Sequence, residues 1–185
     1  MRWWPMPDAD LNAIAAGFAF DTPRLHVRPL QGDDEAFYCA LYTDADTQRH
    51  TGGALAPAAA RRSFTAALAA PQRTPMQRLY LMLCERRERS ALGMVGLNDI
   101  DASARRTEIG ILMSPQARGA GYGREGFGAL AAQIFQRLPI DEIYVQYATA
   151  NIGADRLATG VGFRYADPPG RVSGADQRVA VMYRG

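Results

Sequence analysis

The chain of 185 residues contains no lysine, and all 21 of its basic side chains are arginine. Schiff-base chemistry, which needs a lysine amine, is therefore excluded. The two cysteines, Cys39 and Cys84, are too few for a disulfide framework, and no close group of Cys and His indicates a zinc site. We expect a function that uses no metal, in a protein that works in the reducing cytoplasm.

The sequence also lacks an apolar run long enough to span a bilayer. The most apolar N-terminal stretch, Leu11–Phe20, has only ten residues, and Asp8 and Asp10 precede it, which is unlike a signal peptide. We expect a short helix there, packed on the domain, and no membrane partner. The nearby Trp3 and Trp4 could form a contact in a homodimer, which the sequence does not decide.

Charge of one sign is scarce, because the formal net charge is +2 and charged residues make up 22% of the chain. The densest basic stretch, Glu85–Arg89, alternates with acids and is typical of a solvated hairpin turn. A nucleic-acid-binding stripe is therefore not expected. With 48% hydrophobic residues, the chain has the composition of an ordinary globular domain.

No repeat or linker divides the chain, so we expect an N-terminal extension, residues 1–21, followed by one domain, residues 22–185. Period-two alternation predicts strands, and apolar residues at helical spacing predict helices. The strands expected first are 24–28, 79–84, 93–98 and 106–113, and the helices are 31–43 and 57–70. The later ones are helices 121–137 and 152–160 and strands 143–149, 163–165 and 178–183.

Short polar turns join strands 79–84, 93–98 and 106–113, which predicts an antiparallel meander. The segment from 106 to 149 then reads strand, loop, helix, strand, and such a crossover makes its two strands parallel. We therefore expect an α/β fold with a mixed sheet.

The most informative segment is the loop between strand 106–113 and helix 121–137. It contains Gly119, Gly121 and Gly123. Glycines there let backbone N–H groups converge at a helix N-terminus, which is an arrangement that binds phosphate or pyrophosphate.

The nucleotide is not a dinucleotide of the Rossmann type, although Gly121–Gly126 satisfies G-x-G-x-x-G. Seven residues separate Met113 from Gly121, whereas a Rossmann loop follows its strand at once. The next strand also ends at Thr149–Asn151 without an acidic residue. A nucleotide-dependent oxidoreductase remains a distant alternative.

The segment Arg118–Gly123 resembles the acetyl-CoA loop of the GNAT superfamily of N-acetyltransferases, [Q/R]-x-x-G-x-[G/A]. The resemblance extends over most of the chain and points to the RimJ/RimL-like branch. Thr22–Leu30 is similar to the opening strand of that branch, and Glu108–Ile111 is similar to its fourth strand. The signature that follows the fifth strand is matched by Asn151, Ala154, Leu157 and Gly162–Phe163.

The resemblance implies a mixed, mostly antiparallel sheet with one parallel, splayed strand pair, flanked by helices. It also implies acetyl-CoA as co-substrate, with the pantetheine arm in the gap between the splayed strands. Asn151 would contact that arm, although an asparagine before a helix is also a common N-cap. The other residues that the resemblance places at the cofactor are Ile111, Leu112, Met113, Arg118, Gly119, Ala120, Gly121, Tyr122, Gly123 and Arg124.

Acetyl transfer needs a neutral amine. A lysine-like amine, with a pKa near ~10.4, loses about 4 kcal/mol to protonation at neutral pH, and an α-amine near ~8 loses about 1 kcal/mol. Glu108 matches the place where several members of the superfamily carry their general base. On a strand it should share one face with Gly110 and Leu112. The alternative is an ion pair across the sheet with an arginine.

The chain departs from its relatives at the general acid. Ala158 stands where many of them have tyrosine, Ala154 where some have serine, and Gln146 where others have glutamate. No acid can be carried over by position, so Tyr147, Thr149, Thr159 or water could serve. A non-catalytic CoA-binding module with this fold is therefore the main alternative.

The acceptor site is less defined. His50, in the segment Asp44–Gly53, falls where relatives wall that site, so we expect it to contact substrate. Asp44 and Asp46 could attract an amine or could cap helices and turns. The acceptor could be a protein N-terminus or a small amine, such as an antibiotic, a polyamine or an amino acid.

Overall fold

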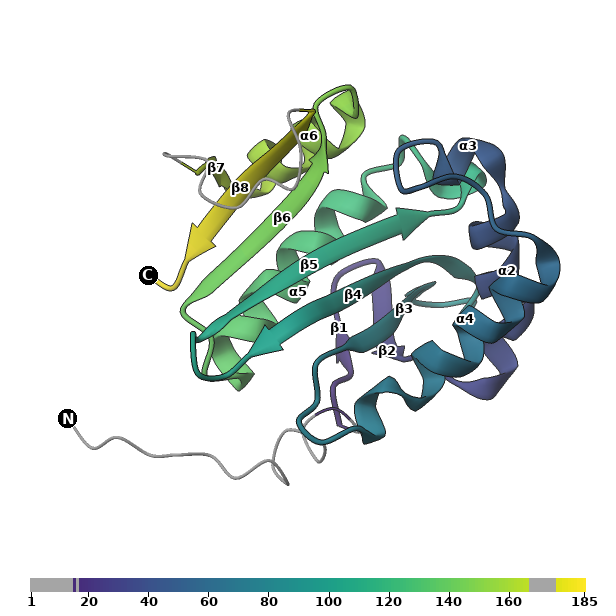
Figure 1. Cartoon of the computed structure of the whole chain (residues 1–185), viewed down its shortest axis with the longest axis horizontal. Coiled ribbons are helices and arrows are strands. Elements are labelled where there is room, and N and C mark those ends of the chain that lie inside the picture. Colours follow the sequence, from purple (N-terminus) through teal and green to yellow (C-terminus); the bar gives the residue numbers. More distant parts are fainter. Residues whose placement is uncertain (1–14, 16, 167–175) are drawn as a thin grey trace.

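Within residues 15, 17–166 and 176–185, which the computed structural model describes, eight strands form one sheet in the order β1-β2-β3-β4-β5-β6-β8-β7 (Figure 1). All neighbouring pairs are antiparallel except β5 and β6, which are parallel. This confirms the predicted mixed sheet. Its strands are β1 (Phe20–Asp21), β2 (Leu25–Pro29), β3 (Leu79–Glu85), β4 (Ala91–Asp101), β5 (Arg106–Met113), β6 (Glu142–Ala148), β7 (Arg164–Tyr165) and β8 (Gln177–Tyr183).

Five α-helices in this part of the chain accompany the sheet, with short 3₁₀ turns beside three of them. They are α2 (Glu35–Thr43), α3 (Ala45–Gln48), α4 (Pro57–Ala69), α5 (Tyr122–Arg137) and α6 (Ile152–Val161). The predicted helix 31–43 begins later, at Glu35, because Gly32–Asp34 forms a 3₁₀ turn before it.

Helix α3 was not predicted, since the segment was interpreted as a loop. The Asp44 carboxylate begins it by accepting hydrogen bonds from the Thr47 N–H and hydroxyl. Of the expected N-terminal helix, residues 11–14 and 16 lie outside the described part, as do Trp3 and Trp4. Phe18 is buried in the core, and the strand β1 that follows pairs with β2.

The helices cover both faces of the sheet (Figure 1). Helices α5 and α6 pack on one face, where Leu130, Ile134 and Ala158 meet inward residues of the strands. Helices α2 and α4 pack on the other, where Tyr38 and Phe64 meet Met82 and Met94. Side chains of β5 therefore alternate between two cores: Ile109, Ile111 and Met113 face α5, and Leu112 faces the opposite side.

Strands β5 and β6 separate along their length. Only three register pairs join them, at their first residues: Arg106–Glu142, Thr107–Ile143 and Glu108–Tyr144. Beyond Glu108 each strand is held by its outer neighbour alone, β5 by β4 and β6 by β8. Figure 1 shows the two arrows diverging from their common start, with α5 behind the opening.

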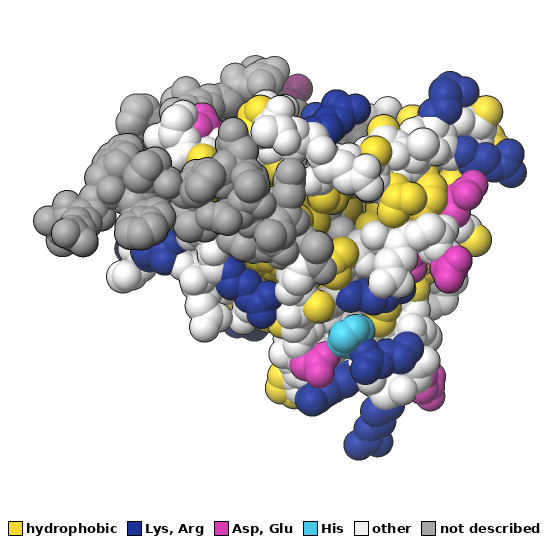
Figure 2. Space-filling model, turned by 90° about the horizontal axis from the view of Figure 1, so that it is seen from below, with side chains coloured by type: hydrophobic (Ala, Val, Ile, Leu, Met, Phe, Trp, Pro, Cys, Tyr) yellow, Lys and Arg dark blue, Asp and Glu magenta, His cyan; other side chains and the backbone are white. Residues whose placement is uncertain are grey.

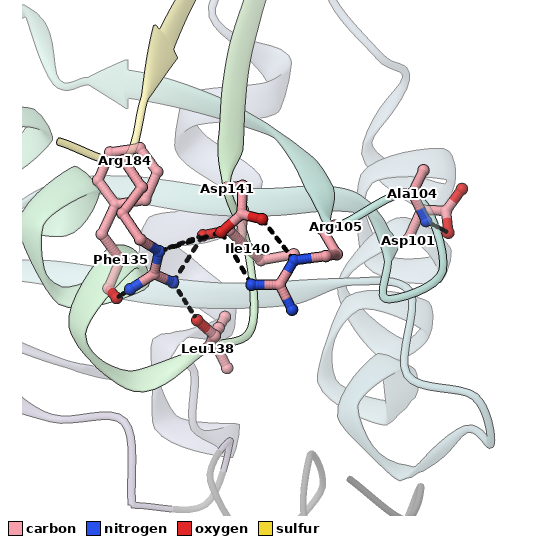
Figure 3. Close-up of polar contacts among 8 residues, drawn as sticks. All are labelled: Asp101, Ala104, Arg105, Phe135, Leu138, Ile140, Asp141 and Arg184. Atoms are coloured by element: carbon pink, nitrogen blue, oxygen red, sulfur yellow. Dashed lines mark hydrogen bonds and ion pairs between the residues drawn. The ribbon is translucent and has the colours of Figure 1, made fainter. Parts of the chain in front are cut away.

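A cluster of charged groups closes the joined end of these strands (Figure 3). The Arg105 guanidinium binds the Asp141 carboxylate, and the Arg105 carbonyl accepts the backbone N–H groups of Asp141 (2.7 Å) and Glu142 (3.1 Å). Arg184 then joins Asp141 to the end of α5, because it donates to the carbonyls of Phe135, Leu138 and Ile140. The start of β5, the start of β6, the end of α5 and the C-terminal segment are thus connected at one point.

The surface carries its charge in small groups. On the face in Figure 2, arginine side chains stand singly or beside carboxylates and do not form one continuous band. The positive side chains seen on this face are therefore dispersed. None of the helices in the described part of the chain combines the length and apolar composition needed to cross a membrane.

The cluster at the joined end makes a stability prediction. Arg184→Gln removes a guanidinium that bonds three carbonyls and Asp141, so we expect the melting temperature to fall by about 4 °C or more. Arg156→Gln is the control, since Arg156 is exposed on α6 and has no ion pair or hydrogen bond among the described side chains. Equal melting temperatures for the two variants would contradict the structural role of Arg184.

Candidate functional site

The opening between β5 and β6 exposes backbone hydrogen-bonding groups. The Ser114 N–H donates to the Leu92 carbonyl at 2.9 Å, so this end of β5 directs alternate residues toward β4. The intervening residues, Ile111 and Met113, direct their N–H groups the opposite way, into the gap. An extended amide chain could pair with these groups as a strand would.

The glycine loop leads from the end of β5 to the start of α5. Gly119 and Gly121 have φ values of 80° and 82°, in the left-handed region that side chains disfavour. The first helical bond of α5 is from Glu125 N–H to the Gly121 carbonyl. Among the described residues, no backbone N–H from Gly119 to Arg124 donates to a protein group, so six adjacent donors are free for an anion.

A contact from the first part of the domain fixes this loop. The Glu125 carboxylate accepts the Thr22 hydroxyl (2.6 Å), the Arg24 N–H (2.9 Å) and the Arg24 Nε (2.6 Å). Arg24 also donates to the Ala120 carbonyl at 2.8 Å and lies over the Tyr122 ring. Sequence reasoning missed this contact, because no local pattern relates residues about a hundred positions apart.

The loop arginines have different roles. The Arg118 side chain donates to the Thr47 hydroxyl (2.6 Å) and to the Met113 carbonyl (3.1 Å), so it connects the loop to α3. Arg124 lines the groove beside α6. Of the residues expected at the cofactor, only Ala120 and Tyr122 do not line either hollow described next.

Two hollows meet at the gap. A groove of about 710 Å³ runs from the glycine loop to the start of α6. A cavity of about 320 Å³ lies deeper, between β4, β5, β6 and α2. They lie next to each other, and we refer to the two together as the passage. The residues found in both walls are His50, Thr51, Ile111, Leu112, Asn151, Ala154 and Leu157.

Glu108 stands at the inner end of this passage. It lines the cavity with Gly110 and Leu112, as the face assignment predicted. No side chain or backbone group in the described residues donates to its carboxylate, and no salt bridge there includes it. The alternative of an ion pair across the sheet is therefore wrong. Arg106, on the same strand, lies over the Tyr144 ring, 4.4 Å from its centroid.

The environment of Glu108 makes it a better base. Burial raises the pKa of its carboxyl group, and the negative charge of Asp99 raises it further, while Arg78 and Arg106 act in the opposite direction. A carboxylate with a raised pKa holds a proton more firmly, so it can accept one from an amine near neutral pH.

Asn151 and His50 lie where the groove and the cavity join. The Asn151 Oδ1 accepts the Ala154 N–H at 3.1 Å, so the residue is the N-cap of α6 as well as part of the wall. Of the acid candidates, Tyr147 lines the cavity, but its hydroxyl donates to Asp155 at 3.1 Å. Asp44, a candidate for attracting an amine, is the N-cap of α3.

Other polar residues of the cavity were missed by sequence reasoning. Tyr42 comes from α2, and Tyr80 and Asn98 come from β3 and β4. The Tyr80 hydroxyl donates to the Asn98 Oδ1 at 3.3 Å, and Asn98 stands opposite Glu108 in the register. Alternation along the predicted strands could have placed Tyr80 and Asn98 on one face, but not Tyr42.

Comparisons with known proteins agree with this geometry. A family model described as an acetyltransferase (GNAT) domain matches residues 24–164. A search of curated sequences finds no significant match.

Solved structures share the fold at low sequence identity. An acetyltransferase from Agrobacterium tumefaciens str. C58 is 20% identical, with a TM-score of 0.77 over 100% of this chain and 98% of that one. Spermidine N-acetyltransferase from Vibrio cholerae, in complex with CoA and spermine, is 19% identical, with a TM-score of 0.71 over 88% and 96%. The Salmonella typhimurium acetyltransferase that modifies the N-terminal serine of ribosomal protein L7/L12 is 13% identical, with a TM-score of 0.74 over 89% and 97%.

Two glycine substitutions test whether acetyl-CoA binding depends on the left-handed backbone of the loop. A Cβ on Gly121 would lie 3.3 Å from the Arg24 guanidinium at a positive φ, whereas a Cβ on Gly123 would make ordinary contacts at 3.6 Å or more. We expect Gly121→Ala to weaken acetyl-CoA binding about tenfold, because left-handed alanine costs about 1–2 kcal/mol. Gly123→Ala adds no left-handed strain and should lose less affinity than Gly121→Ala in the same calorimetric titration. Equal affinity of the two variants would contradict this account of the loop.

Proposed function

The chain belongs to the GNAT family of acetyltransferases, and we propose that it transfers an acetyl group from acetyl-CoA to a primary amine by direct attack in a ternary complex. The observation that carries this proposal is the passage between β5 and β6. It connects free N–H groups at the N-terminus of α5 to an unpaired, half-buried carboxylate, Glu108.

The residues present fit acetyl-CoA. The pyrophosphate would lie at the N–H groups of Gly119–Arg124, where the helix dipole also favours negative charge. The Arg124 side chain, in the same wall, would add a positive charge. Ile111, Leu112 and Met113 would line the pantetheine arm, whose amides find free backbone groups in the gap, and Asn151 would contact it near the thioester.

Acetyl-CoA supplies the acetyl group as an activated thioester. As the new C–N bond replaces the C–S bond, the amine must lose a proton, and Glu108 accepts it, directly or through one water molecule. Backbone N–H groups near Met113 would stabilise the negative charge that develops on the acetyl oxygen. His50, at the junction of groove and cavity, contacts the acceptor.

The proton for the departing thiolate does not come from the position that relatives use. Ala158 has no ionisable group, and the Tyr147 hydroxyl is bonded to Asp155. Burial raises the pKa of Tyr147, and its hydrogen bond to Asp155 raises it further, so it is a weak acid. We therefore assign this proton to water.

We also propose residues 22–185 as the catalytic domain, after an extension of residues 1–21, and a cytoplasmic location. Free thiols at Cys39 and Cys84 support that location. The rival proposal is a CoA-binding module without activity, which the alanines at 154 and 158 favour. It expects acetyl-CoA binding but no CoA release with any amine.

Glu108→Gln tests the mechanism. We expect kcat/KM for a peptide α-amine or a small amine to fall by about 10²-fold or more, measured as CoA release from acetyl-CoA. In the wild type, kcat/KM should also fall as pH drops through the raised pKa of Glu108, because the protonated carboxyl cannot accept a proton. That acidic limb should be absent in the variant.

Glu142→Gln is the matched control, since Glu142 lies on β6 in the same parallel pair but outside both hollows. It should retain wild-type kcat/KM. If Glu108→Gln shows unchanged kcat/KM from pH 6 to 9, Glu108 is not the base.

A further inference from the structure

A third hollow, a recess in the surface, lies beside the cavity that Glu108 lines. It has a volume of about 250 Å³ and is lined by residues of α2, of α4 and of the segment that leads into β3. Figure 1 shows α2 and α4 together on one face of the sheet. Tyr42 and Tyr80 line both the recess and the cavity, so the two are adjacent. The polar members of its wall are Tyr38, Tyr42, Ser63, Arg73, Gln77, Arg78 and Tyr80, and we name it the arginine recess.

The charges of the arginine recess are all positive. Arg73 and Arg78 line it and no Asp or Glu does, while Glu108 is the one carboxylate in the wall of the cavity. Neither arginine takes part in any ion pair of the described residues, although many other arginines do. No carboxylate of the described residues neutralises either guanidinium, so both are available to an anion, although Arg78 also interacts with the Tyr80 hydroxyl.

The sheet register places Arg78 on the acceptor side. Leu79 pairs with Leu97, and Asn98 pairs with Glu108, so Arg78 precedes β3 in the same row as Asn98 and Glu108. Arg78 and Glu108 are thus two strand spacings apart, about 10 Å between backbones, on one face. Arg78 lines the recess and Glu108 lines the adjacent cavity. The positive charge of Arg78 nevertheless acts on Glu108, because it opposes the rise in the pKa of that carboxyl that burial and Asp99 cause.

We propose, on the basis of the acetyltransferase function proposed above, that the acceptor is an amino acid whose carboxylate binds Arg78 and Arg73 while its amine reaches Glu108. A planar guanidinium matches a carboxylate with two parallel hydrogen bonds. The amine and the carboxylate of an amino acid lie a few ångströms apart, so with a hydrogen bond of about 2.8 Å at each end it covers much of the roughly 10 Å between the backbones of Arg78 and Glu108.

The same charges disfavour a polyamine. A polycation would have to place positive charge beside two arginines, and it would find one carboxylate, Glu108, in the cavity. The recess is open to solvent at Arg73, Gln77 and Arg78, so a peptide acceptor is tested beside the small ones.

The experiment measures CoA release from acetyl-CoA with three sets of acceptors: the twenty free amino acids, their carboxamides, and spermidine with a short peptide. We expect at least one amino acid to exceed its own carboxamide by about 10- to 100-fold in kcat/KM, the range for a hydrogen bond between charged groups. Arg78→Gln should reduce that ratio about tenfold, and the ratio is the readout because any change in the pKa of Glu108 affects the amino acid and its carboxamide alike. Arg62→Gln, at an exposed position of α4 outside the recess, should keep the ratio.

The outcomes separate the two proposals. Equal or faster turnover of the carboxamides, of spermidine or of the peptide overturns the amino acid assignment but leaves the acetyltransferase function in place. A wild-type preference that survives in Arg78→Gln overturns the role of the arginine recess. If no acceptor causes CoA release from acetyl-CoA, both proposals are overturned.

Discussion

The structure depends on one feature of its sheet, the separation of the parallel strands β5 and β6 after three register pairs. Two neighbouring strands normally satisfy each other's backbone groups. Here the N–H groups of Ile111 and Met113 face the gap without a partner strand. The cavity at the gap has walls from α5 as well as from α2, so the opening reaches both faces of the sheet. A cofactor approaching from one face and an acceptor from the other could then meet at one carboxylate, Glu108. The other elements of the fold keep this opening in shape.

Both ends of the opening are held by arginines. At the joined end, Arg105 and Arg184 bind Asp141 and connect the starts of β5 and β6 to the end of α5. At the wide end, Arg24 and Glu125 hold the glycine loop, and Arg118 connects that loop to α3. Each contact uses two or more donors of one guanidinium, which a lysine ammonium could not match in geometry. The absence of lysine from the chain is thus compatible with an arginine-based framework, although composition alone does not explain it.

The sequence predicted most elements because their signals are local: alternation for β3, β4 and β5, and apolar spacing with Pro57 at the start of α4. The glycine loop and the face of Glu108 followed from the same local patterns. Helix α3 was missed because four residues are too few for periodicity, and only the cap at Asp44 marks it. The arginine recess was missed for another reason. Tyr42, Arg73 and Arg78 come together only when α2, α4 and β3 pack, and no spacing along the chain encodes that packing.

The central claim is that the opening binds acetyl-CoA, and calorimetric titration of the full chain tests it most directly. Acetyl-CoA is the ligand, and NADPH is the control. NADPH also carries a pyrophosphate, but it would bind only if the glycine loop were a dinucleotide-binding loop of the Rossmann type. The account predicts micromolar binding of acetyl-CoA, with one molecule per chain, and no measurable binding of NADPH. Binding of NADPH alone, or no heat with acetyl-CoA, would contradict the interpretation of Arg118–Gly123 and with it the acetyltransferase function.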